Sequence, residues 1–233
     1  MNRLAIMQPY FFPYIGYFQL IAAVDIFIVY DNIKYTKKGW INRNRMLLNG
    51  EDAIFSLPLK KDSDSLDVVQ RELAADFSGT KLLNQFKGAY AQAPYFSQTY
   101  SLLERVICFD DDNLFSYLYN SLIQTCRHLG IKTEIRISST IEIDHNLKAQ
   151  DKVLAICEAM SADTYINTIG GTDLYDKAVF HAQGIQLQFI KAKPFEYAQF
   201  EAKFLPWLSI TDVLMFNSLD AVHANVHSNF DLI

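Results

Sequence analysis

The sequence predicts an α/β fold with a mostly parallel sheet, helices on both faces, and a helical and hairpin insertion. Short apolar runs rich in β-branched residues alternate with helical patterns, and this alternation favours parallel strands joined by crossover helices. The 233 residues are 50% hydrophobic, which is enough for a large core. No low-complexity linker or internal repeat divides the chain. We therefore expect one domain, residues 1–233, with the insertion at roughly residues 50–110.

The first half of the chain opens as strand, loop, short helix and strand. The apolar run 3–7 stops at Gln8-Pro9, and the run 26–30 is rich in β-branched and aromatic residues. A short helix over 16–23 fits between these two strands. Within the insertion we expect a hairpin of strands 53–59 and 66–73 across residues 60–65, followed by helices over 77–91 and 96–107.

The second half alternates more regularly. The pattern over 113–129 indicates a helix, because Asp112 can cap it, apolar residues recur every four positions from Leu114, and Gly130 ends it. The same reasoning predicts strands over 132–138, 164–168 and 185–190, and helices over 147–160, 173–182 and 208–216. These strands would continue the parallel sheet.

Charge and composition exclude several classes of protein. The formal net charge is −5, whereas a general nucleic-acid binder is normally basic. No apolar run approaches the ~20 residues of a membrane span, and the histidines lack HExxH spacing. An odd number of cysteines without CxxC spacing is typical of a reduced, cytosolic protein. We expect a cytoplasmic protein with no metal, nucleic-acid partner or membrane span, in which Cys108, Cys126 and Cys157 are core residues.

Residues 34–45, the basic segment, hold five basic residues and no acid in an otherwise acidic chain. Lysine and arginine bind phosphate, and a tryptophan can stack on a base or sugar. An anionic ligand is the natural partner, either a nucleotide pyrophosphate or single-stranded nucleic acid. The alternative is a solvated loop with Trp40 as a buried anchor. The substrate-binding candidates here are Lys34, Lys37, Trp40, Asn42, Arg43 and Asn44.

Polar residues follow four of the predicted strands. Ligands of open α/β sheets bind beyond the carboxyl ends of the strands, so these residues would share one edge. Asp31 there can orient an amine or take its proton; otherwise it caps a turn or pairs with Lys34. The other candidates at strand ends are Gln8, Tyr10 and Tyr14 after the first strand, Ser138 and Ser139 after 132–138, and Gly170 and Gly171 after 164–168.

Motifs spread over essentially the whole chain resemble those of one family of bacterial proteins. They are the opening block AIMQPYFFPYIGYF (5–18), 30–32 with 40–44, Ser138-Ser139, Gly170-Gly171 with Tyr175, Tyr197 with Gln199, and 204–209 with Asp212. On these motifs the chain is similar to the WbqC-like family. The resemblance implies biosynthesis of bacterial surface polysaccharide such as O-antigen. It also implies an acyl or aminoacyl (glycine-type) transferase that acts on the amine of a nucleotide-linked amino sugar.

The implied reaction gives the candidates their roles. Asp31 would be the base for the sugar ammonium, and Gln8 and Ser138 would hold polar groups near the acyl carbonyl. The basic segment would hold the pyrophosphate, with Trp40 stacked on the ligand. The acyl donor stays open among a carrier-protein thioester, coenzyme A and an activated amino acid, so an acyl carrier protein is one candidate partner. No other cofactor and no particular oligomer are implied.

Two other functions stay open. The loop 13–17 is similar to the HxGH loop of nucleotidylyltransferases, and 137–140 is similar to their ISST stretch. Tyr14 and Tyr17 replace the two histidines of that loop, so imidazoles that stabilise a transferring phosphate are absent. The third hypothesis is a non-catalytic protein that binds a sugar nucleotide or polysaccharide, because no nucleophile or proton shuttle stands out.

Overall fold

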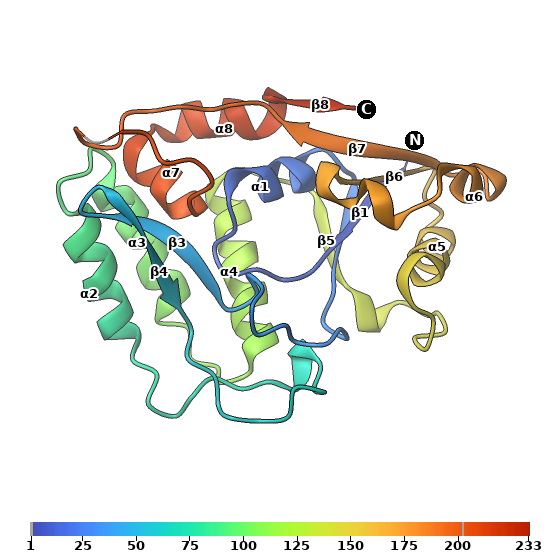
Figure 1. Cartoon of the computed structure of the whole chain (residues 1–233), viewed down its shortest axis with the longest axis horizontal. Coiled ribbons are helices and arrows are strands. Elements are labelled where there is room, and N and C mark those ends of the chain that lie inside the picture. The colour runs from blue at the N-terminus through green and yellow to red at the C-terminus, as the bar shows by residue number, and fades with distance from the viewer. Residues whose placement is uncertain (1, 202) are drawn as a thin grey trace.

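A six-stranded sheet forms the centre of the protein in the computed structural model, which describes residues 2–201 and 203–233 (Figure 1). Five strands run parallel and the last runs antiparallel to its neighbour, which confirms the predicted α/β class. Across the sheet the order is β5 (Glu134–Ile137), β2 (Ile26–Val29), β1 (Arg3–Met7), β6 (Thr164–Thr168), β7 (Gln186–Ala192) and β8 (Phe230–Leu232).

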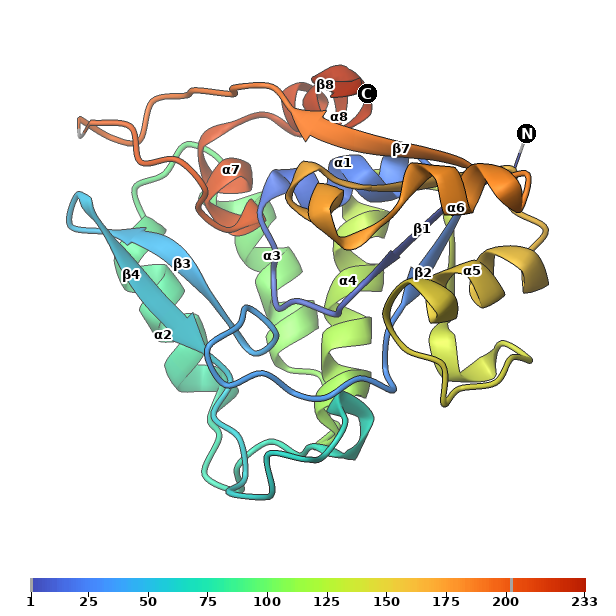
Figure 2. The same cartoon turned by 45° about the vertical axis from the view of Figure 1, so that its right-hand side comes forward.

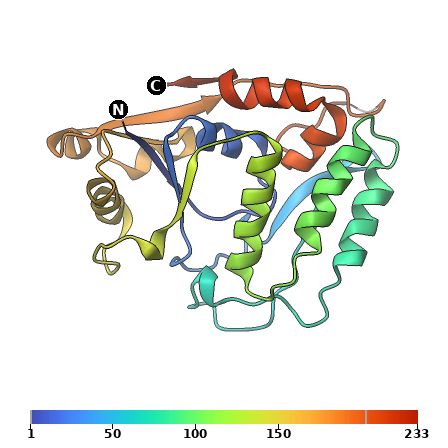
Figure 3. The ribbon, with the colours of Figure 1, turned by 180° about the vertical axis from the view of Figure 1, so that it is seen from behind.

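Side chains alternate between the two faces of the sheet, as the period of two in a strand requires. In β1, Leu4 and Ile6 belong to one buried cluster and Ala5 to the other. The face of Leu4 is covered by α5 and α6, and the opposite face by α1, α4, α7 and α8 (Figures 2 and 3). The helices are α1 (Ile15–Ala22), α2 (Gly79–Tyr90), α3 (Phe96–Ile107), α4 (Leu114–His128), α5 (Ala149–Ala159), α6 (Lys177–Ala182), α7 (Ile210–Phe216) and α8 (Leu219–Ser228).

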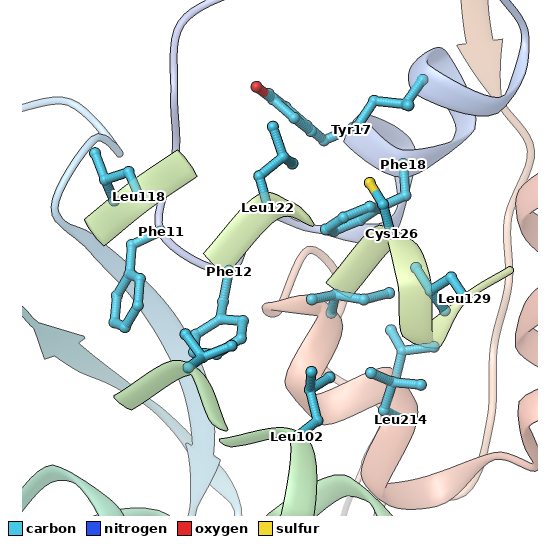
Figure 4. Packing of buried hydrophobic residues seen from close by; sticks show 14 of the residues in the cluster. Phe11, Phe12, Tyr17, Phe18, Leu102, Leu118, Leu122, Cys126, Leu129 and Leu214 are labelled. Carbon is cyan, nitrogen blue, oxygen red and sulfur yellow. The ribbon is translucent and has the colours of Figure 1, made fainter. Parts of the chain in front are cut away.

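The loop between β1 and α1 is anchored by its phenylalanines. Phe11, Phe12 and Phe18 have no exposed surface and belong to the buried cluster of Figure 4. The centre of the Phe11 ring lies 6.1 Å from that of the Tyr117 ring of α4, and the centre of the Phe12 ring lies 6.5 Å from that of the Phe86 ring of α2. Each such burial contributes about 1.5–3 kcal/mol of transfer free energy. The loop that carries Gln8 and Tyr10 is therefore rigidly attached to the core.

The predicted hairpin of strands 53–59 and 66–73 is wrong. The antiparallel pair is β3 (Arg43–Leu48) with β4 (Glu51–Ser56), joined at Asn49-Gly50. These turn residues have φ of 54° and 82°, which a two-residue type I′ turn requires and Asn-Gly favours. Residues 66–73 instead contain a short 3₁₀ helix, η1 (Val68–Gln70).

Other boundaries differ because of capping. Residues 169–174 form a 3₁₀ helix, η3 (Ile169–Leu174), and α6 begins only after Asp176, which accepts a hydrogen bond from the Ala178 N–H. At α4 the capping residue is Asn113 and not Asp112. The helix α8 and the strand β8 at the C-terminus were not predicted from the sequence. None of the helices in the described residues is long and apolar enough to cross a membrane.

Candidate functional site

The carboxyl ends of four neighbouring strands arrange polar residues along one edge of the sheet. Ser138 follows β5, Asp31 and Asn32 follow β2, Gln8 follows β1, and Gly170 lies in the turn after β6. The chain builds the sheet outward from β1 through β2 to β5, and then adds β6 on the other side of β1. Ligands of open α/β sheets bind where the strand order reverses in this way. The position between β1 and β6 is such a switch point.

Asp31 is almost completely buried, with 3% of its surface exposed, and one of its oxygens is fixed. Oδ1 accepts hydrogen bonds from Ser138 Oγ at 2.8 Å and from the Ser139 N–H at 2.9 Å. Oδ2 has no partner among the described residues, and Lys34 is exposed and makes no ion pair with it there. Oδ2 is not one of the fully buried polar atoms without a partner, so it keeps some contact with solvent. It is thus an accessible acceptor for an N–H group of a ligand.

Asn32 links this pair to two side chains that come from the segment after β5. Its Oδ1 lies 2.7 Å from Ser138 Oγ and accepts a hydrogen bond from Lys152 Nζ at 3.3 Å. Its Nδ2 lies 3.0 Å from His145 Nδ1, and His145 Nε2 lies 3.0 Å from the carbonyl oxygen of Ile141. When His145 carries its proton on Nε2, its Nδ1 accepts from the Asn32 amide and its Nε2–H donates to the Ile141 carbonyl, so both contacts are satisfied. His145 therefore supports Asn32. Ser138 has no exposed surface of its own.

Lys152 is a buried cation that the sequence analysis did not propose for the site. Only 8% of its surface is exposed, and it makes no ion pair among the described residues. Its Nζ lies 5.4 Å from the centre of the Tyr30 ring. Burial lowers the pKa of Lys152, and the charges of Asp67 and Asp31 oppose that shift. The helix dipole disfavours a lysine near the start of a helix such as α5. The position of Lys152 there is therefore a feature of the sequence that could have marked it as a candidate site residue.

Gln8 presents its amide at the same edge. Its Oε1 accepts a hydrogen bond from Tyr10 Oη at 3.2 Å, and its backbone oxygen accepts one from Tyr17 Oη at 2.8 Å. The Nε2 group has no partner among the described residues and can donate to a ligand carbonyl. Tyr17, at the position of the second histidine in an HxGH loop, is 2% exposed and committed to Gln8.

The turn after β6 contains one glycine that is open and one that is required for packing. A Cβ at Gly170 would meet nothing within 4 Å, so backbone there is accessible to a ligand. A Cβ at Gly171 would lie 3.1 Å from Asn167 Oδ1. Asn167 is itself fixed, because its Nδ2 donates to the hydroxyl groups of Tyr165 and Tyr175 at 2.8 and 3.2 Å.

The basic segment exposes most of its charge. Lys34 is exposed, whereas Lys37 is paired with Asp64 at 2.8 Å. Trp40 is 42% exposed, so the alternative of a buried anchor is wrong. The guanidinium carbons of Arg43 and Arg45 lie 5.9 and 5.7 Å from the centre of its ring. This arrangement offers an aromatic face beside two cations.

Two of the candidate residues in the basic segment serve the backbone. Asn42 donates to the Leu57 carbonyl at 2.7 Å, and Asn44 donates to the carbonyls of Phe11 and Phe12 at 3.2 and 2.9 Å. The Asn44 bonds tie the segment to the loop after β1, and the Asn42 bond ties it to the residue after β4. The expected contacts of both side chains with substrate stay a prediction. Tyr14 lies apart from Asp31 in this arrangement, with its ring against that of Trp207.

A second buried carboxylate lies in α7. Asp212 has no exposed surface and accepts hydrogen bonds from Tyr90 Oη at 2.7 Å, Tyr197 Oη at 2.7 Å and Gln199 Nε2 at 2.8 Å. Burial raises the pKa of Asp212, although the three donors lower it. Tyr90 also accepts the Leu47 N–H at 2.8 Å. The network therefore joins α2, β3, α7 and the segment after β7.

Comparison with known proteins places this geometry in a family. The model of the WbqC-like protein family matches residues 8–224, which include the strand-end residues, the basic segment and Asp212. The chain belongs to the WbqC-like protein family. It is 27% identical over 220 residues to an uncharacterized protein of Mycobacterium tuberculosis, covering 93% of this chain and 94% of that protein. No solved structure matches the chain.

The cysteines of this WbqC-like chain lie outside the strand-end cluster. Cys126 and Cys157 are buried, and burial raises the pKa of each thiol to about 12. Cys108 is exposed just after the end of α3, so the expectation that all three are core residues is wrong for it. In the described residues no three His, Cys, Asp or Glu side chains gather in a way that could hold a metal ion.

Alkylation tests the prediction that no cysteine is a nucleophile. Under the transferase hypothesis drawn from the sequence, iodoacetamide should modify Cys108 in the native protein and leave turnover intact, because the thiolate is the reactive form and the other two thiols are buried and protonated. Peptide mass spectrometry locates the modified residues, and urea-unfolded protein is the positive control. Rapid inactivation traced to any cysteine would instead indicate a covalent acyl-thioester intermediate.

Proposed function

We propose that this chain transfers an acyl or aminoacyl group to the amine of a nucleotide-linked amino sugar, in the biosynthesis of bacterial surface polysaccharide such as O-antigen. The observation that carries the proposal is the state of Asp31. Its Oδ1 is fixed by Ser138 and Ser139, and its Oδ2 has no partner among the described residues. A preorganised carboxylate with one free oxygen suits a ligand ammonium.

In the proposed reaction the sugar ammonium gives a proton to Asp31 Oδ2, and the neutral nitrogen attacks the acyl carbon of the donor. The new C–N bond replaces the bond between that carbon and its leaving group, and the second proton of the nitrogen passes to the leaving group or to solvent as that group departs as a thiol or a phosphate. Gln8 Nε2 is the free donor at this edge for the acyl oxygen, which gains negative charge during attack. Lys152, held on Asn32 Oδ1, would balance the buried charge of Asp31.

The basic segment would hold the pyrophosphate of the acceptor. Its backbone is tied to the loop after β1 where Ile41 accepts a hydrogen bond from the Phe11 N–H at 2.9 Å, so its charges lie near the strand ends. Lys34 is exposed and Arg43 lies beside the ring of Trp40, which suits an anion attached to a planar or sugar ring. The WbqC-like family membership supports the same setting.

A double substitution tests the role of the basic segment. Lys34→Ala with Arg43→Ala should weaken the binding of a UDP-sugar about 10-fold or more, because two charged contacts to phosphate are lost. Isothermal titration calorimetry measures the affinity, and circular dichroism checks the fold. The matched control is Lys81→Ala with Arg105→Ala, which removes two exposed charges from α2 and α3. Unchanged affinity in the first variant would remove the basic segment from the site.

A further inference from the structure

A cavity of about 410 Å³ opens beyond the carboxyl end of β7, beside the start of α1. This volume lies in the range of small-ligand sites. The segment between β7 and α7 forms much of its wall. Figure 1 shows the course of this segment. Its aromatic lining consists of Tyr14, Phe195, Tyr197, Phe204 and Trp207.

Trp207 is held in a costly conformation at the mouth of this cavity. Its φ is 63°, a left-handed value that a bulky side chain rarely adopts, and 63% of its surface is exposed. Its carbonyl oxygen accepts a hydrogen bond from Arg45 Nη2 at 3.1 Å, and the Ser209 N–H donates to the Arg45 carbonyl at 2.9 Å. The fold thus fixes the backbone immediately after an indole that it leaves exposed. Such strain is typical of ligand-binding positions.

Tyr14 is fixed on the opposite side by a close approach. The centres of the Tyr14 and Trp207 rings are 5.7 Å apart, and the rings meet edge to face at 68°. A Cβ at Gly16 would lie only 2.4 Å from the Tyr14 ring, so the ring can occupy this place only because residue 16 is glycine. Two aromatic side chains are therefore preorganised at one opening.

Positive charge adjoins the aromatic lining. Lys191 and Lys193 line the cavity; Lys193 is paired with Asp231 at 2.7 Å, and Lys191 has no ion pair among the described residues. The helix α1 begins at Ile15, in the cavity wall, and no side chain caps it. The start of a helix favours an anion. The opening thus combines faces for a planar ring with groups for a phosphate.

We infer that this cavity binds the base of a nucleotide, with the phosphate at Lys191 and the start of α1. Five aromatic side chains favour a planar ring over an aliphatic chain, because aromatic pairs gain energy beyond their buried area. The Tyr197 hydroxyl is already committed to Asp212, so this residue offers a ligand its ring and not its hydroxyl. Every base can stack on an indole, so we infer that a nucleotide binds here without assigning its base.

Arg45 connects the cavity to the basic segment. The same guanidinium that holds the Trp207 carbonyl lies 5.7 Å from the centre of the Trp40 ring. The nucleotide therefore comes from one of two sources, the sugar nucleotide itself or an acyl donor that contains adenosine phosphate. This part of the inference rests on the proposed function, whereas nucleotide binding at Trp207 does not.

The two tryptophans allow the inference to be tested by fluorescence. Trp40→Phe leaves Trp207 as the only indole, and Trp207→Phe leaves Trp40. UMP and AMP, as probes of the two sources, are titrated into each variant, with inorganic phosphate as the control for charge alone. We expect at least one nucleotide to quench Trp207 saturably in Trp40→Phe, while phosphate does not. Quenching by AMP alone would assign the cavity to the acyl donor, and quenching by UMP would assign it to the sugar nucleotide.

Calorimetry with the same nucleotide completes the test. Trp207→Ala should raise its Kd about 10-fold, and Trp207→Phe should restore most of the affinity because a ring is retained. The control is Phe109→Ala, which removes an exposed aromatic side chain beyond α3. No saturable quenching of Trp207, or an unchanged Kd in Trp207→Ala, would overturn the inference. If nucleotides then quench Trp40 only, the proposed role of the basic segment is retained. If they quench neither indole, the inference about the cavity and the proposed role of the basic segment are both contradicted.

Discussion

Replacing Asp212 by alanine should lower the free energy of unfolding by about 3–5 kcal/mol. The carboxylate has no exposed surface and accepts three hydrogen bonds, from Tyr90, Tyr197 and Gln199. Alanine would leave three buried donors unsatisfied, and each unsatisfied group costs about 1–3 kcal/mol. Partial relaxation of the segment after β7 offsets some of that loss. Urea unfolding followed by circular dichroism measures the difference.

The control for this prediction is Asp220→Ala. Asp220 also lies in the first turn of a helix, α8, but its side chain is exposed, so the substitution should cost about 0.5 kcal/mol. A loss below about 1 kcal/mol in Asp212→Ala would contradict the role of the carboxylate as the centre of the network. Loss of the aromatic cavity should accompany the large effect, because Tyr197 lines it.

The same carboxyl gives a pH dependence of defined sign. Burial raises the pKa of Asp212 above the ordinary value of 3.8. Between pH 3.8 and the raised pKa of Asp212 in the folded protein, the folded protein binds more protons than the unfolded chain. The stability contributed by Asp212 therefore falls as the pH rises through that window. The difference in unfolding free energy between the natural protein and Asp212→Ala should therefore be larger below pH ~4 than at neutral pH. A difference that grows with pH would contradict this assignment.

The sheet and its functional edge follow from local patterns in the sequence. Parallel strands buried on both faces read as short apolar runs, and the 164–168 strand was predicted with its observed bounds. Once the strands are parallel, the residues after them share an edge, which brings Asp31 and Ser138 within hydrogen-bonding distance although 107 positions separate them. The proximity of Asp31 and Ser138 was therefore predictable from the order and direction of the strands and not from a motif.

The partners at the edge could not be predicted in the same way. Lys152 reaches Asn32 across 120 positions because α5 and β2 contribute to the same buried cluster, and no local pattern encodes that distance. The amides of Asn42 and Asn44 looked free to bind a ligand, but buried carbonyl groups of the neighbouring loops use them. The β3–β4 hairpin, by contrast, is signalled by Asn49-Gly50, but the polar residues 43–45 at the start of β3 do not resemble a buried strand.

Asp31→Asn should lower the turnover of acyl transfer about 100-fold or more, the usual scale for loss of a general base. The substitution nearly preserves shape. Its Oδ1 still accepts from Ser138 and Ser139, so the amide nitrogen takes the place of Oδ2, the oxygen without a partner. That nitrogen cannot accept a proton or a hydrogen bond from an ammonium. The fold should therefore persist while the proposed contact with the amine is lost.

The pH–rate profile and the separate kinetic constants distinguish the two roles that Asp31 can have. If it takes the proton, the acidic limb of the kcat profile should disappear in Asp31→Asn. If it only orients the amine, KM should rise while kcat is kept. Asp67→Asn is the matched control, since Asp67 also acts on Lys152 electrostatically but is not bonded to Ser138. Mass spectrometry of the acylated sugar nucleotide measures turnover. Full turnover in Asp31→Asn would remove Asp31 from the reaction, and the reacting groups would then be sought around Ser138 and Gly170 at the same edge.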